Sequence, residues 1–324
     1  MEKYHSVPNL PYALSLNSFS MEDACTQNRY LTPAQLADAL GVGRSTVHRW
    51  VDQGRILAER TPGGHRRIGL PDAVHFVRST NARLANPAAL GIRGEADATL
   101  EATQPESLAA TLEALLRGGD GAGLRSFIWH SYVSGASVHH LVDQGIVPAM
   151  QRIGQLWPED PRGILVEHRA TELCVEAINH LNSLAFRPAD SAPLAIGGAI
   201  PGDPFILPSL MASTTLRDAG WRTQNYGSNT PPSTMGLALR ETGARLVWLS
   251  VSTLTHMRVF TEAVDELSQI VVDGGAQLLV GGRGVPAGWQ PVLPCVHRLN
   301  NMQELDGFAR GLAAAHTPLP AANA

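Results

Sequence analysis

The sequence has few cysteines and no long apolar run. Its three cysteines, Cys25, Cys174 and Cys295, lie far apart, are odd in number and include no C-x-x-C pair. This pattern argues against a disulfide framework or a cysteine metal site and is typical of a reducing compartment. No stretch approaches the roughly 20 apolar residues that cross a bilayer, and the N-terminus lacks the apolar core of a signal peptide. We therefore expect a soluble, cytoplasmic protein with no membrane partner.

The chain also lacks the short motifs that usually identify an enzyme. It has no H-E-x-x-H zinc motif, no Walker phosphate loop, no Ser-His-Asp arrangement, and no G-x-G-x-x-G after the first apolar run of its C-terminal half. The paired acids Glu159 and Asp160 are flanked by prolines, which is typical of a solvated turn. We therefore expect the chain to catalyse no reaction.

Length and patterning predict a multidomain α/β protein. At 324 residues, of which 44% are hydrophobic, the chain is long enough for two or three globular domains. The predicted segments are a disordered N-terminus (1–28), a winged helix-turn-helix domain (29–80), a linker (81–105), a four-helix bundle (106–187), a Rossmann-like domain (188–316) and a tail (317–324).

The two larger C-terminal segments differ in their apolar period. Residues 107–186 contain four amphipathic stretches joined by glycine-rich turns, which favours a four-helix bundle. Beyond them, short apolar runs alternate with helical stretches, which predicts a doubly wound and mainly parallel sheet. The predicted strands are 194–200, 222–227, 245–252, 276–281 and 296–299.

Residues 31–52 read as two short helices separated by a glycine turn. Thr32 is placed to cap the first helix and Pro33 to occupy its first position. The stretch Gly41-Val42-Gly43 then interrupts it, and a second helix begins at Arg44. A second helix that starts with polar residues is typical of a helix-turn-helix, in which it enters the major groove of double-stranded DNA.

Residues 55–68 add the pattern of a hairpin wing. A first strand leads to the turn 62–64 (Pro-Gly-Gly), and the return strand opens with His65 and two arginines. Residues 29–78 hold eight arginines and four acidic residues, a net +4 in a chain whose formal net charge is −4. A basic head on an acidic body indicates that the head binds DNA. The predicted DNA contacts are Arg44, Ser45, Thr46 and Arg49 near the bases, and Arg60, Thr61, His65, Arg66 and Arg67 at the phosphate backbone.

Small residues end the predicted strands of the C-terminal half. Ligands of open α/β sheets bind beyond these carboxyl ends, although ordinary turns have a similar composition. Upstream, Trp157 is followed after nine residues by Glu167 and His168. An indole, a carboxylate and an imidazole at the end of a bundle suit a large planar ligand.

These motifs resemble two known modules. The stretch 61–68 (TPGGHRRI) is similar to the wing of the MerR family, and the W-x9-E-H bundle followed by the sheet resembles the cobalamin-binding module. Together they resemble the CarH-type light-responsive repressors, which implies adenosylcobalamin as cofactor, a dimer or higher oligomer on DNA, and a light response. The resemblance places the cofactor contacts at Trp157, Glu167, His168, Asp203, Phe205, Ser252, Thr253, Gly281 and Gly282.

One departure concerns the axial ligand. The family's D-x-H-x-x-G loop supplies a histidine to cobalt from below, but here Phe205 stands at the histidine and Pro208 at the glycine. Phenylalanine has no lone pair to give to a metal, so no bond to cobalt is expected there. Asp203, which orients that imidazole in the family, is expected to be left without that role.

Several interpretations stay open at this point. In the first, the crevice beyond the carboxyl ends of the predicted strands binds a cobalamin without a protein ligand from below, and His168 is a candidate metal ligand on the upper face. In the second, it binds another tetrapyrrole such as haem or a bilin. In the third, it binds nothing and the domain serves for interaction. The rival from another class is a corrinoid methyl-transfer protein, which shares the bundle and the sheet. The head and Phe205 favour a transcriptional regulator, a repressor by the resemblance.

Overall fold

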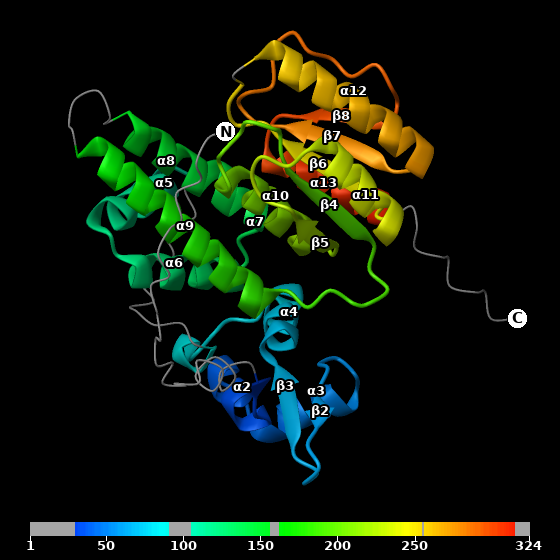
Figure 1. Ribbon diagram of the computed structural model, residues 1–324. Coiled ribbons are helices and arrows are strands. Elements are labelled where there is room, and N and C mark those ends of the chain that lie inside the picture. Colours follow the sequence, from blue (N-terminus) through cyan, green and yellow to red (C-terminus); the bar gives the residue numbers. More distant parts are fainter. Residues whose placement is uncertain (1–29, 91–104, 156–161, 255, 315–324) are drawn as a thin grey trace, which may run out of the picture.

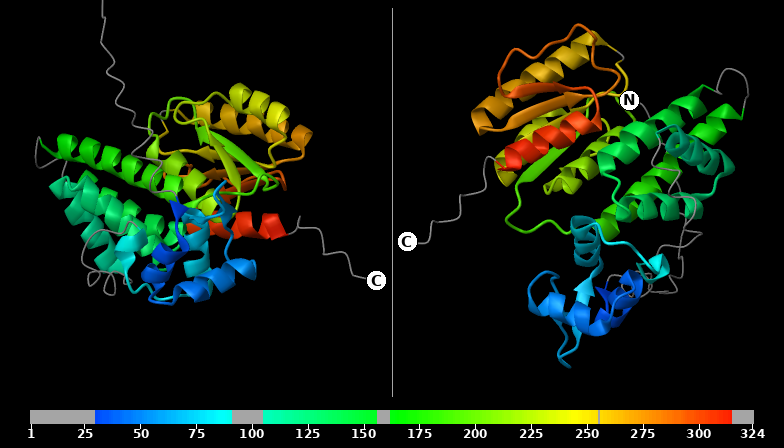
Figure 2. Two further views of the ribbon diagram at one scale, coloured as in Figure 1. Left: turned by 90° about the horizontal axis from the view of Figure 1, so that it is seen from below. Right: turned by 180° about the vertical axis from the view of Figure 1, so that it is seen from behind.

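The computed structural model describes residues 30–90, 105–155, 162–254 and 256–314 (Figure 1). The predicted disordered N-terminus and tail lie outside these residues, as does most of the predicted linker. The head forms one end of the molecule, and the helical bundle and the sheet domain lie beside each other above it (Figures 1 and 2). Within the part of the chain that is described, each helix is too short or too polar to span a bilayer.

The head is a small helical domain with a three-stranded antiparallel sheet. Its elements are β1 (Tyr30–Leu31), α2 (Pro33–Leu40), α3 (Arg44–Asp52), β2 (Glu59–Arg60), β3 (Arg66–Gly69) and α4 (Leu70–Thr80), with strand order β1-β3-β2. Thr32 and Gln35 form a reciprocal capping box at the start of α2. Gly41 ends α2 at φ +64, where a Cβ would come within 2.8 Å of that of Ala85. Glycine is therefore required at this turn.

Part of the predicted linker packs against the head and the bundle. Residues 87–90 form the 3-10 turn η1 (Pro87–Leu90), which contacts α2, and Leu90 is buried. The indole Nε1 of Trp129 in the bundle donates to the carbonyl of Leu90 at 3.1 Å. The linker prediction for residues 91–104 lies outside the described residues.

The bundle consists of four helical stretches, as predicted. They are α5 (Pro105–Gly118), α6 (Gly121–Val133), a continuous run of α7 (Val138–Leu141), the π-helical segment η4 (Val142–Ile146) and α8 (Val147–Gly154), and α9 (Gly163–Ala185). Gly145 in η4 has Leu108 and Leu112 of α5 against its backbone, since a Cβ there would lie 2.7 Å from Leu112. This close approach seats η4 on α5.

The C-terminal half is a five-stranded, wholly parallel sheet, which confirms the predicted doubly wound fold. In chain order it comprises β4 (Leu194–Ala199), α10 (Leu207–Asp218), β5 (Arg222–Asn225), α11 (Pro232–Thr242), β6 (Leu246–Ser250), α12 (Met257–Gly274), β7 (Gln277–Gly281), β8 (Val296–Leu299) and α13 (Met302–Ala314). The strand order is β5-β4-β6-β7-β8. Helices α10 and α13 contact each other on one face, and α11 and α12 contact each other on the other.

The apolar core connects the three parts of the molecule. One cluster of buried side chains runs from the head through the bundle to Leu207 and Met211 of α10. Two further clusters fill the two faces of the sheet. The bundle therefore packs on the sheet domain through α10, and the head packs on the bundle.

Candidate functional site

Helix α3 presents the polar side chains expected of a recognition helix. Val47 is its one fully buried residue, and it seats the helix on the head. Of the predicted base contacts, Arg44, Ser45 and Arg49 are exposed and Thr46 is half-buried. No side chain caps the start of α3, so its first amides stay available to an anion such as phosphate.

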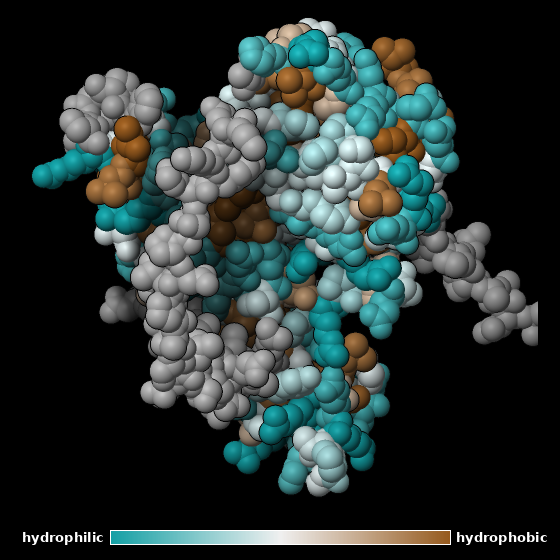
Figure 3. All heavy atoms as spheres, in the orientation of Figure 1, coloured by the Kyte–Doolittle hydropathy of each residue, from teal (hydrophilic) through white to brown (hydrophobic). Residues whose placement is uncertain are grey.

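The wing is a tight turn between β2 and β3. The amide of Thr61 donates to the carbonyl of His65 at 2.9 Å, the His65 amide donates to Thr61 Oγ1 at 3.2 Å, and Gly64 adopts φ +78. Arg60, His65 and Arg67 are exposed beside α3. The end of the head that carries these strands is coloured mainly as hydrophilic in Figure 3.

Two arginines near the predicted DNA-binding face of the head are engaged within the protein. Arg66 forms an ion pair with Asp52 at the end of α3, and its Nη1 lies 3.0 Å from His48 Nδ1; its side chain is 18% exposed. Arg55 lies over the ring of Trp50 with 5.6 Å to the centroid. Arg66 was predicted to contact the phosphates, and in the structure its partners make it a clamp between the wing and α3.

At the carboxyl edge of the sheet, Asp203 organises two loops. Its carboxylate is fully buried and accepts from the amide of Phe205 at 3.1 Å and from the amide of Ser252 at 2.5 Å. The backbone carbonyl of Asp203 also accepts from Asn229 at 3.0 Å. With no imidazole to orient, Asp203 instead pins the loop after β4 to the loop after β6.

The glycines after β7 allow a close approach of backbones. The amide of Val251 donates to the carbonyl of Gly281 at 2.9 Å. Gly282 has φ +118, and a Cβ there would collide with the Val251 carbonyl. Between the loops after β4 and β6 lies a pocket of about 270 Å³, lined mainly by apolar side chains and including Thr253. The Oγ of Ser252 is buried and has no hydrogen-bond partner among the described residues.

Of the other predicted ligand contacts, Phe205 lies in a loop at this edge, Glu167 and His168 lie on α9, and Trp157 is not among the described residues. Phe205 is 47% exposed in the loop that precedes α10. Glu167 is half-buried and His168 exposed on α9, and neither forms a hydrogen bond or ion pair with a described residue. Among the described residues, no three His, Cys, Asp or Glu side chains gather in a way that could hold a metal ion.

The donor chemistry of this edge decides what it could hold. The pocket is mainly apolar but includes Thr253 and His256, which suits an organic ligand with a hydrogen-bonding group. The unpaired hydroxyl of Ser252 is buried beside it and does not line it. The loop before α10 offers no lone pair at Phe205, so it does not fit a cobalamin whose cobalt is bonded from that loop. The described residues thus fit a ligand held by contact and hydrogen bonds.

Two family models match this chain, one in the head and one in the bundle. Residues 30–68 match the model of a helix-turn-helix domain, and residues 108–182 match that of a B12 binding domain. No curated protein matches the chain. The two matches together fit the architecture of a DNA-binding head joined to a cobalamin-binding module.

Three solved structures match this chain over part of its length. The monomethylamine corrinoid protein of Methanosarcina barkeri superposes with a TM-score of 0.51 and 17% identity, over 64% of this chain and all of that chain. The methanol:cobalamin methyltransferase complex of the same organism gives a TM-score of 0.36 and 14% identity, over 72% of this chain and 95% of that one. A cobalamin-binding protein of Desulfitobacterium hafniense gives a TM-score of 0.29 and 15% identity, over 63% of this chain and 95% of that one. The first of these shares the fold with this chain.

Several of these contacts had no signal in the sequence. The clamp of Arg66 on Asp52 joins residues 14 positions apart, and Asp203 reaches Ser252 across 49. Only the tertiary arrangement brings them together, although the acid at the end of α3 and the arginine pair of the wing were both visible.

Proposed function

We propose that the chain is a transcriptional regulator that binds double-stranded DNA through its head and senses a ligand through its C-terminal half. The observation that carries this proposal is the exposed polar face of α3 beside an arginine-bearing wing, on a chain whose helical bundle matches a B12 binding domain. A MerR-type assignment, a cytoplasmic location and self-association as a dimer or higher oligomer belong to the same proposal.

The head would read DNA in two ways. Arg44, Ser45, Thr46 and Arg49 would face base edges in the major groove and the phosphates beside it. Arg60, Thr61, His65 and Arg67 would contact the backbone, which fixes register and carries no sequence information. In this arrangement Arg66 positions the wing and contacts no phosphate.

The sheet edge would hold the ligand. The B12 binding match, which covers the bundle, supports a corrinoid that would lie over the loops after β4 and β6 with Phe205 against a flat face. The pocket between these loops, which Thr253 lines, would take only part of such a ligand. Glu167 and His168 would approach it from the bundle, with His168 as a candidate metal ligand. Three kinds of ligand would satisfy this chemistry: haem, a bilin, or a cobalamin whose own base stays on the cobalt. A light response would follow only with adenosylcobalamin.

A corrinoid methyl-transfer protein is the alternative of another class. The shared fold with a corrinoid protein favours it. The helix-turn-helix match and the absence of a donor at Phe205 favour a regulator that catalyses no reaction.

Two assays on the full-length protein separate these possibilities. The first selects duplexes from a random pool, and we expect enrichment of one sequence. The second records visible spectra after incubation with adenosylcobalamin or haemin and desalting, in darkness and after illumination. Enrichment without any retained chromophore would leave a DNA-binding interaction protein. Corrinoid retention without enrichment, together with methyl transfer, would overturn the regulator.

A further inference from the structure

A network of polar side chains joins the head to the bundle. Arg78 near the end of α4 donates from Nη1 to the backbone carbonyls of Tyr132, in a short contact, and of Ala136 at 2.8 Å. Its guanidinium carbon also lies 3.8 Å from the centroid of the Tyr132 ring. A cation held by two carbonyls and a ring face fixes the direction of α4 relative to α6.

The same tyrosine continues the network into the sheet domain. The buried phenol of Tyr132 donates to Asp218 Oδ1 at 2.9 Å. The other oxygen of Asp218 accepts from the amide of Val138 at 3.2 Å, and the Asp218 side chain is 7% exposed. Arg310 of α13 donates to the Asp218 carbonyl at 3.0 Å and lies 3.7 Å from its carboxylate. Asp218 therefore connects the bundle, α10 and α13.

Helix α10 links this network to the candidate ligand edge. It begins at Leu207, directly after the loop that carries Phe205 and is pinned by Asp203, and it ends at Asp218. At 1.5 Å per residue its 12 residues span about 18 Å. A helix packed between bundle and sheet moves as one body, so a shift at its start also moves Asp218.

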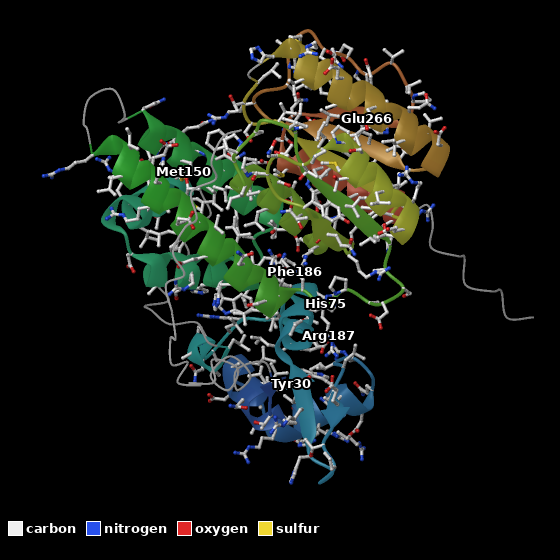
Figure 4. All side chains as sticks on the ribbon, viewed as in Figure 1. Tyr30, His75, Met150, Phe186, Arg187 and Glu266 are labelled. Carbon is white, nitrogen blue, oxygen red and sulfur yellow. The ribbon has the colours of Figure 1, made fainter. Side chains whose placement is uncertain are left out.

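A second contact between the head and the rest is weaker. Arg187, just after α9, pairs with Glu59 of the wing at 3.1 Å, and Figure 4 shows Arg187 close to Phe186, His75 and Tyr30 at the junction. Both partners of the pair are more than half exposed, so water and salt screen it. The buried Tyr132 network is the stronger determinant of the head's orientation.

We infer that Tyr132 and Asp218 are positioning residues that set the orientation of the DNA-binding head, and that α10 transmits movement from the ligand edge to them. This inference rests on the proposed function, and it names the residues through which ligand binding at the sheet edge would reach the head. Burial, reinforced by the charge of Asp218, raises the pKa of Tyr132 well above its ordinary value. The phenol therefore stays a donor at neutral pH.

Hydrogen exchange of the full-length protein, followed by mass spectrometry, tests the inference without DNA. Tyr132→Phe keeps the ring beneath Arg78 and removes one hydrogen bond. We expect amides of α4 to exchange roughly 2- to 10-fold faster. The matched control Tyr226→Phe removes a hydroxyl bonded to Gln224 at 2.9 Å and should leave α4 unchanged.

A second variant tests the α13 side of the same network. Arg310→Met alters a half-exposed side chain that the core does not need, and we expect faster exchange in α4 as well as in α13. Its control, Arg258→Met, removes a similar i,i+4 pair on α12 and should not affect α4. Wild-type exchange of α4 in both Tyr132→Phe and Arg310→Met would overturn the inference. A failure to bind DNA would overturn only the proposed function.

Discussion

Replacing Arg67 by alanine should flatten the salt dependence of DNA binding, whereas replacing Arg66 should not. The two arginines are adjacent in β3, yet Arg67 is exposed and Arg66 is paired with Asp52 and His48. A free cation beside the groove releases counterions when it meets a phosphate, and a cation already paired within the protein does not.

The magnitude follows from counterion release. Each phosphate contact contributes about −0.9 to the slope of log K against log salt. Removing Arg67 should therefore make the slope shallower by about 0.9 for each subunit on DNA. Arg66→Ala should weaken binding by loosening the wing, with the slope unchanged.

Fluorescence anisotropy with a selected duplex over a series of salt concentrations measures both quantities. Arg258→Ala serves as control, because this exposed arginine lies on α12 far from the head. An equal flattening in Arg66→Ala and Arg67→Ala would refute the clamp and place Arg66 at a phosphate. An unchanged slope in Arg67→Ala would refute the wing as a phosphate contact.

Three further predictions concern the bundle and the sheet domain. Asp203→Ala leaves two amides of buried loops without an acceptor, so urea unfolding should show a loss of about 2–4 kcal/mol, whereas a loss near zero would contradict its structural importance. Phe205→His supplies a lone pair at the sheet edge and should tighten hydroxocobalamin binding more than about tenfold with an altered visible spectrum; identical spectra would mean that this loop does not face the corrin. Since the pKa of Tyr132 is raised in the folded state, its contribution to stability is complete below the ordinary tyrosine pKa of 10.0 and is lost as the pH rises above it. As the pH is raised above 10, the free energy of unfolding should therefore fall further from its neutral value in the wild type than in Tyr132→Phe. Parallel curves of unfolding free energy against pH for the two proteins would contradict this.

Local patterns in the sequence predicted the elements of the fold well. Thr32 and Pro33 start α2 as their cap and first-turn preferences indicate, because these effects act within one helical turn. The alternation of apolar runs and helices predicted the parallel sheet, since buried parallel strands are apolar on both faces.

The contacts that define the sites were less accessible to such reasoning. Asp203 was identified by analogy with a motif, and the analogy alone left it without a role once Phe205 replaced the histidine. In the structure it bonds backbone amides, which carry no residue-specific signal in the sequence. Gly282 was predicted as a cofactor contact by resemblance, and in the structure its φ of +118 and its approach to Val251 show a packing requirement between loops.

The interdomain contacts could not be predicted at all. Arg78 reads as one more basic residue of the head, and Tyr132 and Asp218 lie 54 and 140 positions further along the chain. Their proximity depends on how the bundle seats between head and sheet, which no periodicity encodes.

The most direct test of the account is a competition between a selected duplex and a scrambled duplex of the same length for the full-length protein at near-physiological salt. A sequence-specific regulator should prefer the selected duplex by at least about 10³-fold, because base contacts from α3 add to the phosphate contacts that any duplex offers. Equal affinity for the two duplexes would contradict the assignment of α3 as a recognition helix, and with it the central claim.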